Sequence, residues 1–173
     1  MATILLDQKE LPAGLIDRYS LAQRNPDVSE MWVPKEYYDV NDYVQRGWDD
    51  DLQWLLTQSV FGFSNPAKAD AEYQAAPYGR TFSTGDGVEA TVIPAEEAGL
   101  GADRAVVFCV ADEKPALPVE RCPKWGFRGK YGSYVVDVAF RASKDLGHAE
   151  LEIGGFMDLV RAVDRHAQEK LRD

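Results

Sequence analysis

Residues 134–141 read Tyr-Val-Val-Asp-Val-Ala-Phe-Arg, and this stretch decides the fold class. Successive side chains of a strand point to opposite sides, so the apolar residues at 134, 136, 138 and 140 share one face. Asp137 and Arg141 fall on the other face. This alternation predicts a β-strand with one face packed on a core.

Apolar stretches on the N-terminal side predict further strands. Residues 105–110 (AVVFCV) form a nearly continuous apolar run, which is typical of a strand in the centre of a sheet. Residues 52–63 and 88–93 also have strand character, and a glycine-containing turn at 83–87 precedes the second of them. Short connections of this kind favour antiparallel neighbours.

Helices are expected on either side of these strands. Asn65 is a good cap and Pro66 a good first residue for a helix that ends at Ala76. A short helix is predicted over residues 39–46, and a long one begins at Gly154, where apolar residues recur at helical spacing. We therefore expect one domain, residues 1–173, with an α+β fold: a mostly antiparallel sheet with flanking helices in a sandwich.

Composition excludes several classes of function. The 173 residues are 45% hydrophobic and 28% charged, as in an ordinary globular protein. No apolar run is long enough to span a membrane. The net charge of −10 repels phosphate backbones, so nucleic acid is not an expected partner. The partners compatible with an acidic protein are a basic protein, which the negative charge attracts, and a small apolar ligand, which it does not repel.

Motifs for common chemistry are missing from the sequence. No glycine-flanked serine elbow or glycine-rich phosphate loop is present. His148 and His166 have no histidine or cysteine at ligand spacing, and residues 49–51 (DDD) lack the spacing of a calcium loop. We expect no catalytic residue, metal or cofactor.

An acidic, aromatic segment at residues 27–51 is the first candidate recognition site. It has eight acidic residues against Lys35 and Arg46. Tryptophan and tyrosine anchor interfaces, and acidic neighbours would steer a basic partner. The alternative is that the rings complete the core. The aromatic candidates are Trp32, Tyr37, Tyr38, Tyr43 and Trp48, with Trp54 following in the next strand.

A second candidate is the stretch 124–131 (KWGFRGKY), which alternates cations with aromatic rings. Its candidate binding residues are Trp125, Arg128 and Tyr131. This stretch could bind an anionic group of a ligand, or its cations could pair with the acidic segment.

The chain has two cysteines, Cys109 and Cys122. If their strands are adjacent, a disulfide closes a loop of about 14 residues and contributes about 3 kcal/mol. Such a bond implies an oxidising compartment. The alternative is a pair of half-buried thiols.

Three stretches together resemble a known family: residues 11–14 (LPAG), residues 63–73 with Phe63, Ser64 and Tyr73, and residues 129–138 (GKYGSYVVDV). They are similar to the actinobacterial sensor-like domains that occur as lipoproteins and as extracellular parts of receptor kinases. The resemblance implies an antiparallel sheet around a groove, ligand binding without catalysis, and a secreted or membrane-tethered location. The printed sequence has no signal peptide or lipid-attachment cysteine, which leaves the location open between the cell surface and the cytoplasm.

The leading hypothesis is a non-catalytic module that binds a ligand or partner with the aromatic, acidic segment and the neighbouring sheet face. Two alternatives stay open. One is a cofactor-independent, cyclase-like enzyme with an aromatic-lined apolar pocket. The other is an acidic, immunity-type protein that neutralises a basic toxin.

Overall fold

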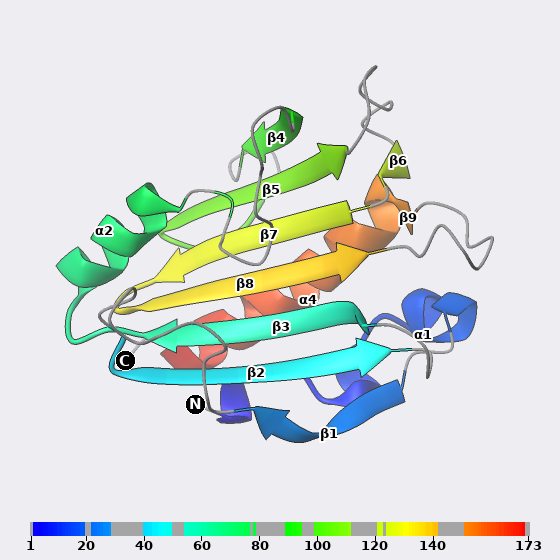
Figure 1. Cartoon of the computed structure of the whole chain (residues 1–173), viewed down its shortest axis with the longest axis horizontal. Coiled ribbons are helices and arrows are strands. Elements are labelled where there is room, and N and C mark those ends of the chain that lie inside the picture. The colour runs from blue at the N-terminus through cyan, green and yellow to red at the C-terminus, as the bar shows by residue number, and fades with distance from the viewer. Residues whose placement is uncertain are drawn as a thin grey trace.

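The computed structural model describes residues 2–19, 22–28, 40–49, 54–76, 78, 89–94, 99–111, 121–122, 124–141 and 151–171. Seven of its strands form one sheet in the order β1-β2-β3-β8-β7-β5-β4 (Figure 1). Every neighbouring pair in this sheet is antiparallel. The predicted α+β class with a mostly antiparallel sheet is therefore confirmed.

The strands of the large sheet are β1 (Ala22–Val28), β2 (Asp42–Asp49), β3 (Trp54–Gly62), β4 (Glu89–Pro94), β5 (Arg104–Ala111), β7 (Lys124–Tyr131) and β8 (Tyr134–Arg141). Strands β6 (Arg121–Cys122) and β9 (Leu151–Glu152) pair separately. The helical elements are η1 (Ala2–Ile4), η2 (Gln8–Glu10), α1 (Ala13–Tyr19), α2 (Pro66–Ala75) and α4 (Ile153–Leu171).

The two longer helices predicted from the sequence, α2 and α4, begin within one residue of their predicted starts. The side chain of Asn65 accepts a hydrogen bond from the Lys68 amide at 3.0 Å, and Pro66 opens α2. Helix α4 follows the predicted apolar stripe. Local capping chemistry and helical spacing were sufficient in these two cases.

The short helix predicted over residues 39–46 is wrong, because residues 42–46 belong to β2. Val44 and Trp48 pack in one hydrophobic cluster, and Tyr43 packs in another. This alternation has the two-residue period of a strand. Pairing of β2 with both β1 and β3 outweighs the local helical tendency.

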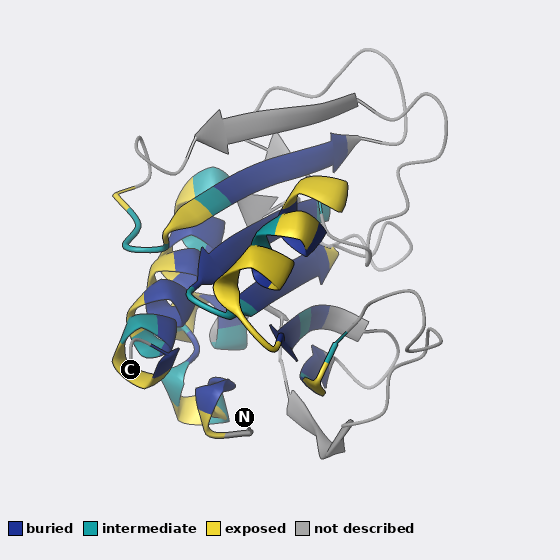
Figure 2. Cartoon of the chain, turned by 90° about the vertical axis from the view of Figure 1, so that its left-hand side faces the viewer, coloured by how far each residue is buried: buried dark blue, intermediate teal, exposed yellow. Residues whose placement is uncertain are grey.

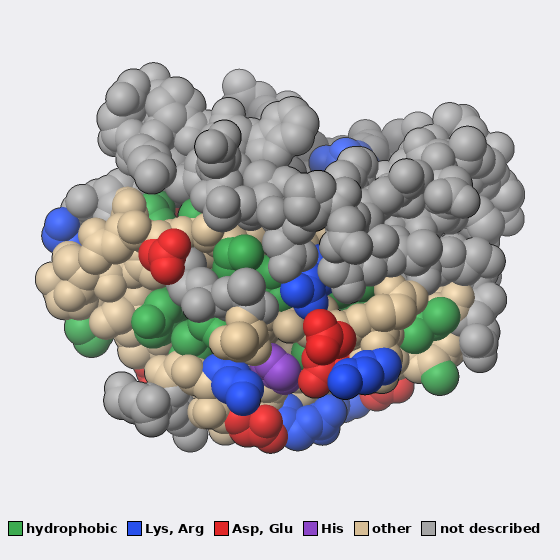
Figure 3. Space-filling view, turned by 90° about the horizontal axis from the view of Figure 1, so that it is seen from below, with side chains coloured by type: hydrophobic (Ala, Val, Ile, Leu, Met, Phe, Trp, Pro, Cys, Tyr) green, Lys and Arg blue, Asp and Glu red, His purple; other side chains and the backbone are tan. Residues whose placement is uncertain are grey.

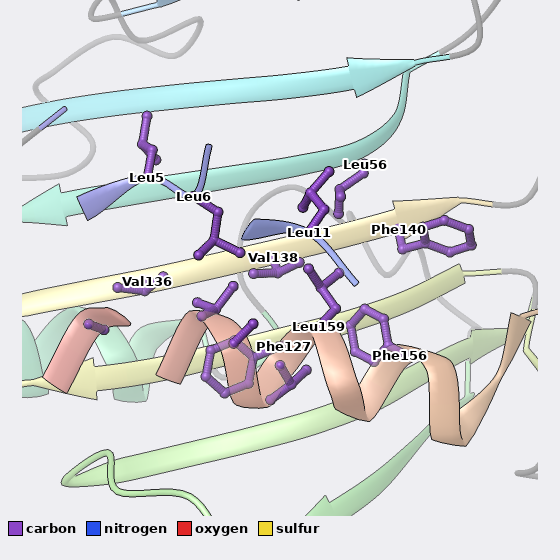
Figure 4. Packing of buried hydrophobic residues seen from close by; sticks show 14 of the residues in the cluster. Leu5, Leu6, Leu11, Leu56, Phe127, Val136, Val138, Phe140, Phe156 and Leu159 are labelled. Carbon is purple, nitrogen blue, oxygen red and sulfur yellow. The ribbon is translucent and has the colours of Figure 1, made fainter. Parts of the chain in front are cut away.

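One face of the sheet carries the main core (Figure 4). The apolar residues of β8 and β7 meet the stripe of α4 there, and the rings of Trp125 and Phe156 stack with centroids 5.5 Å apart. Leu5, Leu6 and Leu11 from the N-terminal segment extend the same cluster. We call this side of the sheet the α4 face.

The N-terminal segment, residues 3–11, is tied to the α4 face by buried polar side chains. The Leu6 amide donates a hydrogen bond to Gln58 Oε1 at 2.9 Å. Arg46 Nη1 donates to the Leu6 carbonyl at 2.8 Å and to Asp7 Oδ1 at 3.0 Å. These bonds satisfy backbone groups that the packing removes from water.

The opposite side of the sheet, which we call the α2 face, carries two smaller apolar clusters. One contains Tyr43 and Phe61, and the other contains Tyr73 and Phe108. Helix α2 contributes a residue to each cluster, and much of its outward side is exposed (Figure 2). The strip of sheet between the two clusters is therefore partly beneath α2.

Candidate functional site

The described aromatic residues among those predicted for recognition do not form one surface, because they lie on both faces of the sheet. Trp32, Tyr37 and Tyr38 lie outside the described residues, as does the side chain of Trp54. Trp48 and Trp125 are 1% and 0% exposed in the core of the α4 face. Tyr43 is buried on the α2 face against Phe61.

Tyr131 is also a core residue. Its hydroxyl donates a hydrogen bond to Asp164 Oδ1 of α4 at 2.8 Å. The same carboxylate accepts from the Gly101 amide and from Gln168 Nε2. This network joins α4 to β7. Tyr131 therefore contributes to packing in the described structure, as do Trp48 and Trp125 in the same core cluster.

Arg128 is a predicted site residue that lies, like Tyr43, on the α2 face, and it belongs to a row of polar side chains across four strands. Strand register places Gln45 opposite Ser59, Ser59 opposite Asp137, and Asp137 opposite Arg128. Residues directly opposite in antiparallel strands project to the same face. We call these four residues the polar row. It runs between the two apolar clusters of the α2 face.

The β7–β8 hairpin fixes the register of Asp137 and Arg128. Gly132 lies in its turn with a φ of +56°, a backbone conformation that glycine adopts without steric cost. The Gly132 amide donates to Asp103 Oδ2 at 2.7 Å. The tight turn therefore holds the two strands so that Asp137 faces Arg128.

Arg128 is clamped between two carboxylates. Its Nη1 donates to Asp137 Oδ2 at 2.7 Å, and its Nη2 donates to Glu72 Oε1 at 3.3 Å. Glu72 comes from α2, so the guanidinium connects this helix to the sheet. Arg128 is 1% exposed and Asp137 is 5% exposed, which makes this a buried ion-pair network.

Two polar atoms of this ion-pair network make no hydrogen bond to the described residues. Asp137 Oδ1 and Arg128 Nε are buried and have no hydrogen-bond partner among the described residues. Gln45 Nε2 donates to Ser59 Oγ at 3.0 Å, and this hydroxyl lies on the strand directly opposite Asp137. Most buried polar groups in proteins are paired, so the two unpartnered atoms call for an explanation.

Burial raises the pKa of Asp137 from 3.8 to about 6. The nearby carboxylate of Glu72 also raises it, whereas the charge and hydrogen bond of Arg128 lower it. Loss of water around the carboxylate outweighs the attraction of the guanidinium. Asp137 therefore titrates close to neutral pH, as carboxyl groups in functional sites often do.

Tyr73 of α2 covers one side of the network. The guanidinium of Arg128 lies 5.8 Å from the centre of its ring, and that of Arg104 lies 5.0 Å from it. Burial raises the pKa of the Tyr73 hydroxyl. The ring therefore helps to keep water from the ion pairs beneath α2.

Two cations of β7, Arg128 and Lys130, pair with acidic residues that lie outside residues 27–51. Lys130 lies 3.3 Å from Asp103 and 3.7 Å from Asp70 of α2. Arg128 pairs with Glu72 and Asp137. For these two cations, the expected link to the acidic segment is replaced by ion pairs with α2, β8 and Asp103.

Asp137 was not among the predicted binding residues. The sequence signal was present, since Asp137 interrupts the run Val135–Val138 at a central position of the clearest strand. A charged residue at such a position needs a partner. The sequence did not show which residues would be its partners. The structure identifies them as Arg128 on the neighbouring strand and, through Arg128, Glu72 on α2.

Cys109 of β5 is disulfide-bonded. The chain has one other cysteine, Cys122, in the short strand β6, and β6 contacts β5. The bond belongs to the α4-face core, away from the polar row.

The described residues contain no group of three or more histidine, cysteine or acidic residues that could hold a metal ion. His166 contacts the Thr3 carbonyl at 2.9 Å and Glu10 at 3.5 Å. Acidic and basic side chains lie next to one another on the described part of the surface seen from below (Figure 3). In the part of the chain that is described, no helix has the length and apolar character to cross a membrane.

A scan against models of protein families gave no match, and a search of curated proteins found no similar protein.

Proposed function

We propose that this chain is a non-catalytic binding module that takes a small ligand on the α2 face of its sheet, at the polar row. The proposal keeps the binding function expected from the sequence. It assigns binding to Ser59, Asp137 and Arg128 instead of to the tryptophans. The resemblance to sensor-like domains also implies ligand binding without catalysis.

The observation that supports this proposal is the pair of buried atoms without a described partner, Asp137 Oδ1 and Arg128 Nε. Each buried unsatisfied group costs about 1–3 kcal/mol. A ligand that hydrogen-bonds both atoms would recover this free energy. The apolar clusters on either side would contact the rest of the ligand, as is typical of small-molecule sites.

A ligand-observed NMR screen of small polar compounds against the full chain tests the proposal. We expect hits whose binding is lost in Asp137→Asn and weakened in Ser59→Ala. The control is Asp158→Asn, an identical change at an exposed residue of α4. Hits that bind all of these variants equally would show that the polar row is not the binding site.

A second candidate function, a cofactor-independent enzyme, is favoured by the titration of Asp137. A buried carboxyl with a pKa of about 6 suits a general acid or base near neutral pH. If one of the screened ligands is converted, we expect its turnover by the native chain to change with pH around 6 and to be abolished in Asp137→Asn. Slow turnover that persists in this variant would exclude Asp137 as the acid or base.

A further inference from the structure

His166 of α4 contacts the N-terminal segment through both nitrogens of its ring. Its Nε2 lies 2.9 Å from the Thr3 carbonyl oxygen, and its Nδ1 lies 3.5 Å from Glu10 Oε1. The His166 side chain is 16% exposed, and that of Glu10 is 34% exposed. Thr3 and Glu10 lie near the two ends of the segment, which also buries Leu6 and Leu11 in the core of the α4 face. The ring therefore joins α4 to both ends of this segment.

Both partners of the ring are hydrogen-bond acceptors. A carbonyl oxygen and an ionised carboxylate have no proton to donate. The Glu10 carboxylate is also held in place, because its Oε2 accepts a hydrogen bond from the Asp7 amide at 2.6 Å. The His166 ring thus meets an acceptor at each of its two nitrogens.

The protonation state of the ring decides whether both acceptors are matched. A neutral imidazole has one N–H, and a charged imidazole has two. A neutral ring that donates from Nε2 to Thr3 places the lone pair of Nδ1 beside the negative charge of Glu10. A neutral ring with its proton on Nδ1 loses the bond to Thr3. The charged ring keeps the bond to Thr3 and adds an ion pair with Glu10.

We infer that His166 is a pH-sensitive clasp, which holds the N-terminal segment on α4 more tightly when its ring is protonated. A histidine ring changes its charge between about pH 5 and 8. Because the protonated form binds the segment more tightly, the attachment is strongest at the acidic end of this range and weakens as the pH rises. The clasp belongs to the α4 face, whereas the ligand proposed above binds on the α2 face.

Other charged residues of α4 do not reverse this preference. Arg165 is adjacent to His166 in the sequence, a spacing at which helical side chains do not face each other. Glu169 and Lys170 lie three and four residues farther along the helix, where side chains are neighbours. Their charges have opposite signs, so their effects on the ring oppose each other.

The charged residues of the N-terminal segment besides Glu10 are Asp7 and Lys9. Asp7 pairs with Arg46 of β2 at 3.0 Å. Lys9 is exposed, so water weakens the effect of its charge. Glu10 is the ion-pair partner of His166 in the described structure. The pH response of the clasp is therefore assigned to the pair of His166 and Glu10.

Amide hydrogen exchange of the full chain measures how often the segment detaches. The Leu6 amide reports on the segment, because it is bonded to Gln58, and the Val160 amide in the middle of α4 reports on unfolding of the whole chain. Protection is expressed relative to an unstructured peptide at the same pH. We expect Leu6 to be protected about threefold more at pH 5.5 than at pH 8, the size of effect typical of an exposed ion pair.

Glu10→Gln removes the negative charge of the clasp and keeps a side-chain oxygen that can accept from the Asp7 amide. The threefold response at Leu6 should disappear in this variant. Asp137 also titrates in this pH range, but it is present in both proteins, so its effect is common to them. The control is Asp158→Asn, which removes an exposed carboxylate of α4 and should keep the response.

His166→Gln, whose side chain does not titrate, should also lose the response. The clasp would be overturned if the protection of Leu6 in the native chain stayed constant or increased from pH 5.5 to pH 8. Parallel changes at Leu6 and Val160 would overturn it as well, because unfolding of the whole chain would then explain the response. A response that persists in Glu10→Gln or His166→Gln would show that this pair is not its origin.

Discussion

Asp137 is the acidic residue in the centre of a strand whose neighbours are mostly apolar. Its position follows from three contacts on the α2 face: Arg128 across one strand pair, Ser59 across the other, and Glu72 through the shared guanidinium. The effect of burial on its pKa makes the stability of the whole chain depend on pH through this one side chain.

The folded chain holds the proton of Asp137 more tightly than the unfolded chain, because the pKa is about 6 when folded and 3.8 at its ordinary value. The stability gained from that proton is fully present below about pH 4 and is lost as the pH rises through 6. We expect the free energy of unfolding of the native chain, relative to Asp137→Asn, to fall by a few kcal/mol between pH 4 and pH 7.

Urea unfolding of both proteins at half-unit pH steps measures this difference. Asp158→Asn serves as the control, since this exposed carboxylate should give a difference that is nearly constant with pH. The raised pKa would be contradicted if the free energy of unfolding of the native chain, minus that of Asp137→Asn, increased between pH 4 and pH 7.

At the scale of elements, β5 and β7 are packed closely because Gly126 has no side chain. Gly126 pairs with Phe108, and a β-carbon at Gly126 would lie 2.1 Å from Cζ of that ring. Phe108 is 1% exposed in its cluster and has little room to move. The ring of Phe108 thus occupies the space that any other residue at position 126 would need.

Gly126→Ala should therefore lower the free energy of unfolding by about 1–3 kcal/mol, the usual cost of overpacking a core. Gly154→Ala is the matched control, because a β-carbon there meets nothing within 4 Å. That substitution should be neutral or slightly stabilising, since alanine favours the helix. Equal effects of the two substitutions in urea unfolding would contradict the close packing at Phe108.

The elements themselves were largely predictable from the sequence, and the exceptions have physical reasons. Alternation identified residues 134–141, and Asn65 with Pro66 identified the start of α2, because these signals are local. Residues 42–49 form a strand through pairing with β1 and β3, which no local signal reports. The burial of Trp48 and Trp125 depends on where α4 and the N-terminal segment pack, and sequence spacing alone does not determine this.

The polar row was less predictable than the fold. Arg128 was a candidate because cations stand out in an acidic chain, but its pairing with Asp137 requires the register of the hairpin. Ser59 and Gln45 enter the row through two further registers. Each of these registers is set by pairing between strands that can be far apart in the sequence. The sequence alone therefore did not predict that the four residues are aligned.

At the scale of the whole molecule, the N-terminal segment is held on the α4 face by the Gln58 side chain, which accepts from the Leu6 amide. Gln58→Leu would leave this buried amide unpaired. We expect amide hydrogen exchange of Leu6 to accelerate at least tenfold, because an unpaired buried donor costs about 1–3 kcal/mol.

Gln74→Leu provides the same change at an exposed position of α2. It should leave exchange at Leu6 unchanged, as measured by NMR in deuterated buffer. Slow exchange at Leu6 in Gln58→Leu would show that apolar packing of the segment is sufficient without this hydrogen bond.

The disulfide of Cys109 also acts on the whole chain, by restricting its unfolded state. A bond from Cys109 to Cys122 closes a loop of about 14 residues, so its reduction should lower the free energy of unfolding by about 3 kcal/mol. Urea unfolding with and without dithiothreitol measures the loss. A Cys109→Ser, Cys122→Ser double variant should be insensitive to the reductant, and a native chain that is equally insensitive would contradict a stabilising bond.

The strand order has a consequence for synthesis on the ribosome. Strand β8 is translated after the other six strands of the large sheet, yet it lies between β3 and β7. Until residues 134–141 emerge, β3 and β7 lack the strand that lies between them, so any sheet that forms earlier has open edges whose backbone groups can pair with other chains. The same late strand brings Asp137 to Arg128, so their ion pair and the joined sheet are completed together.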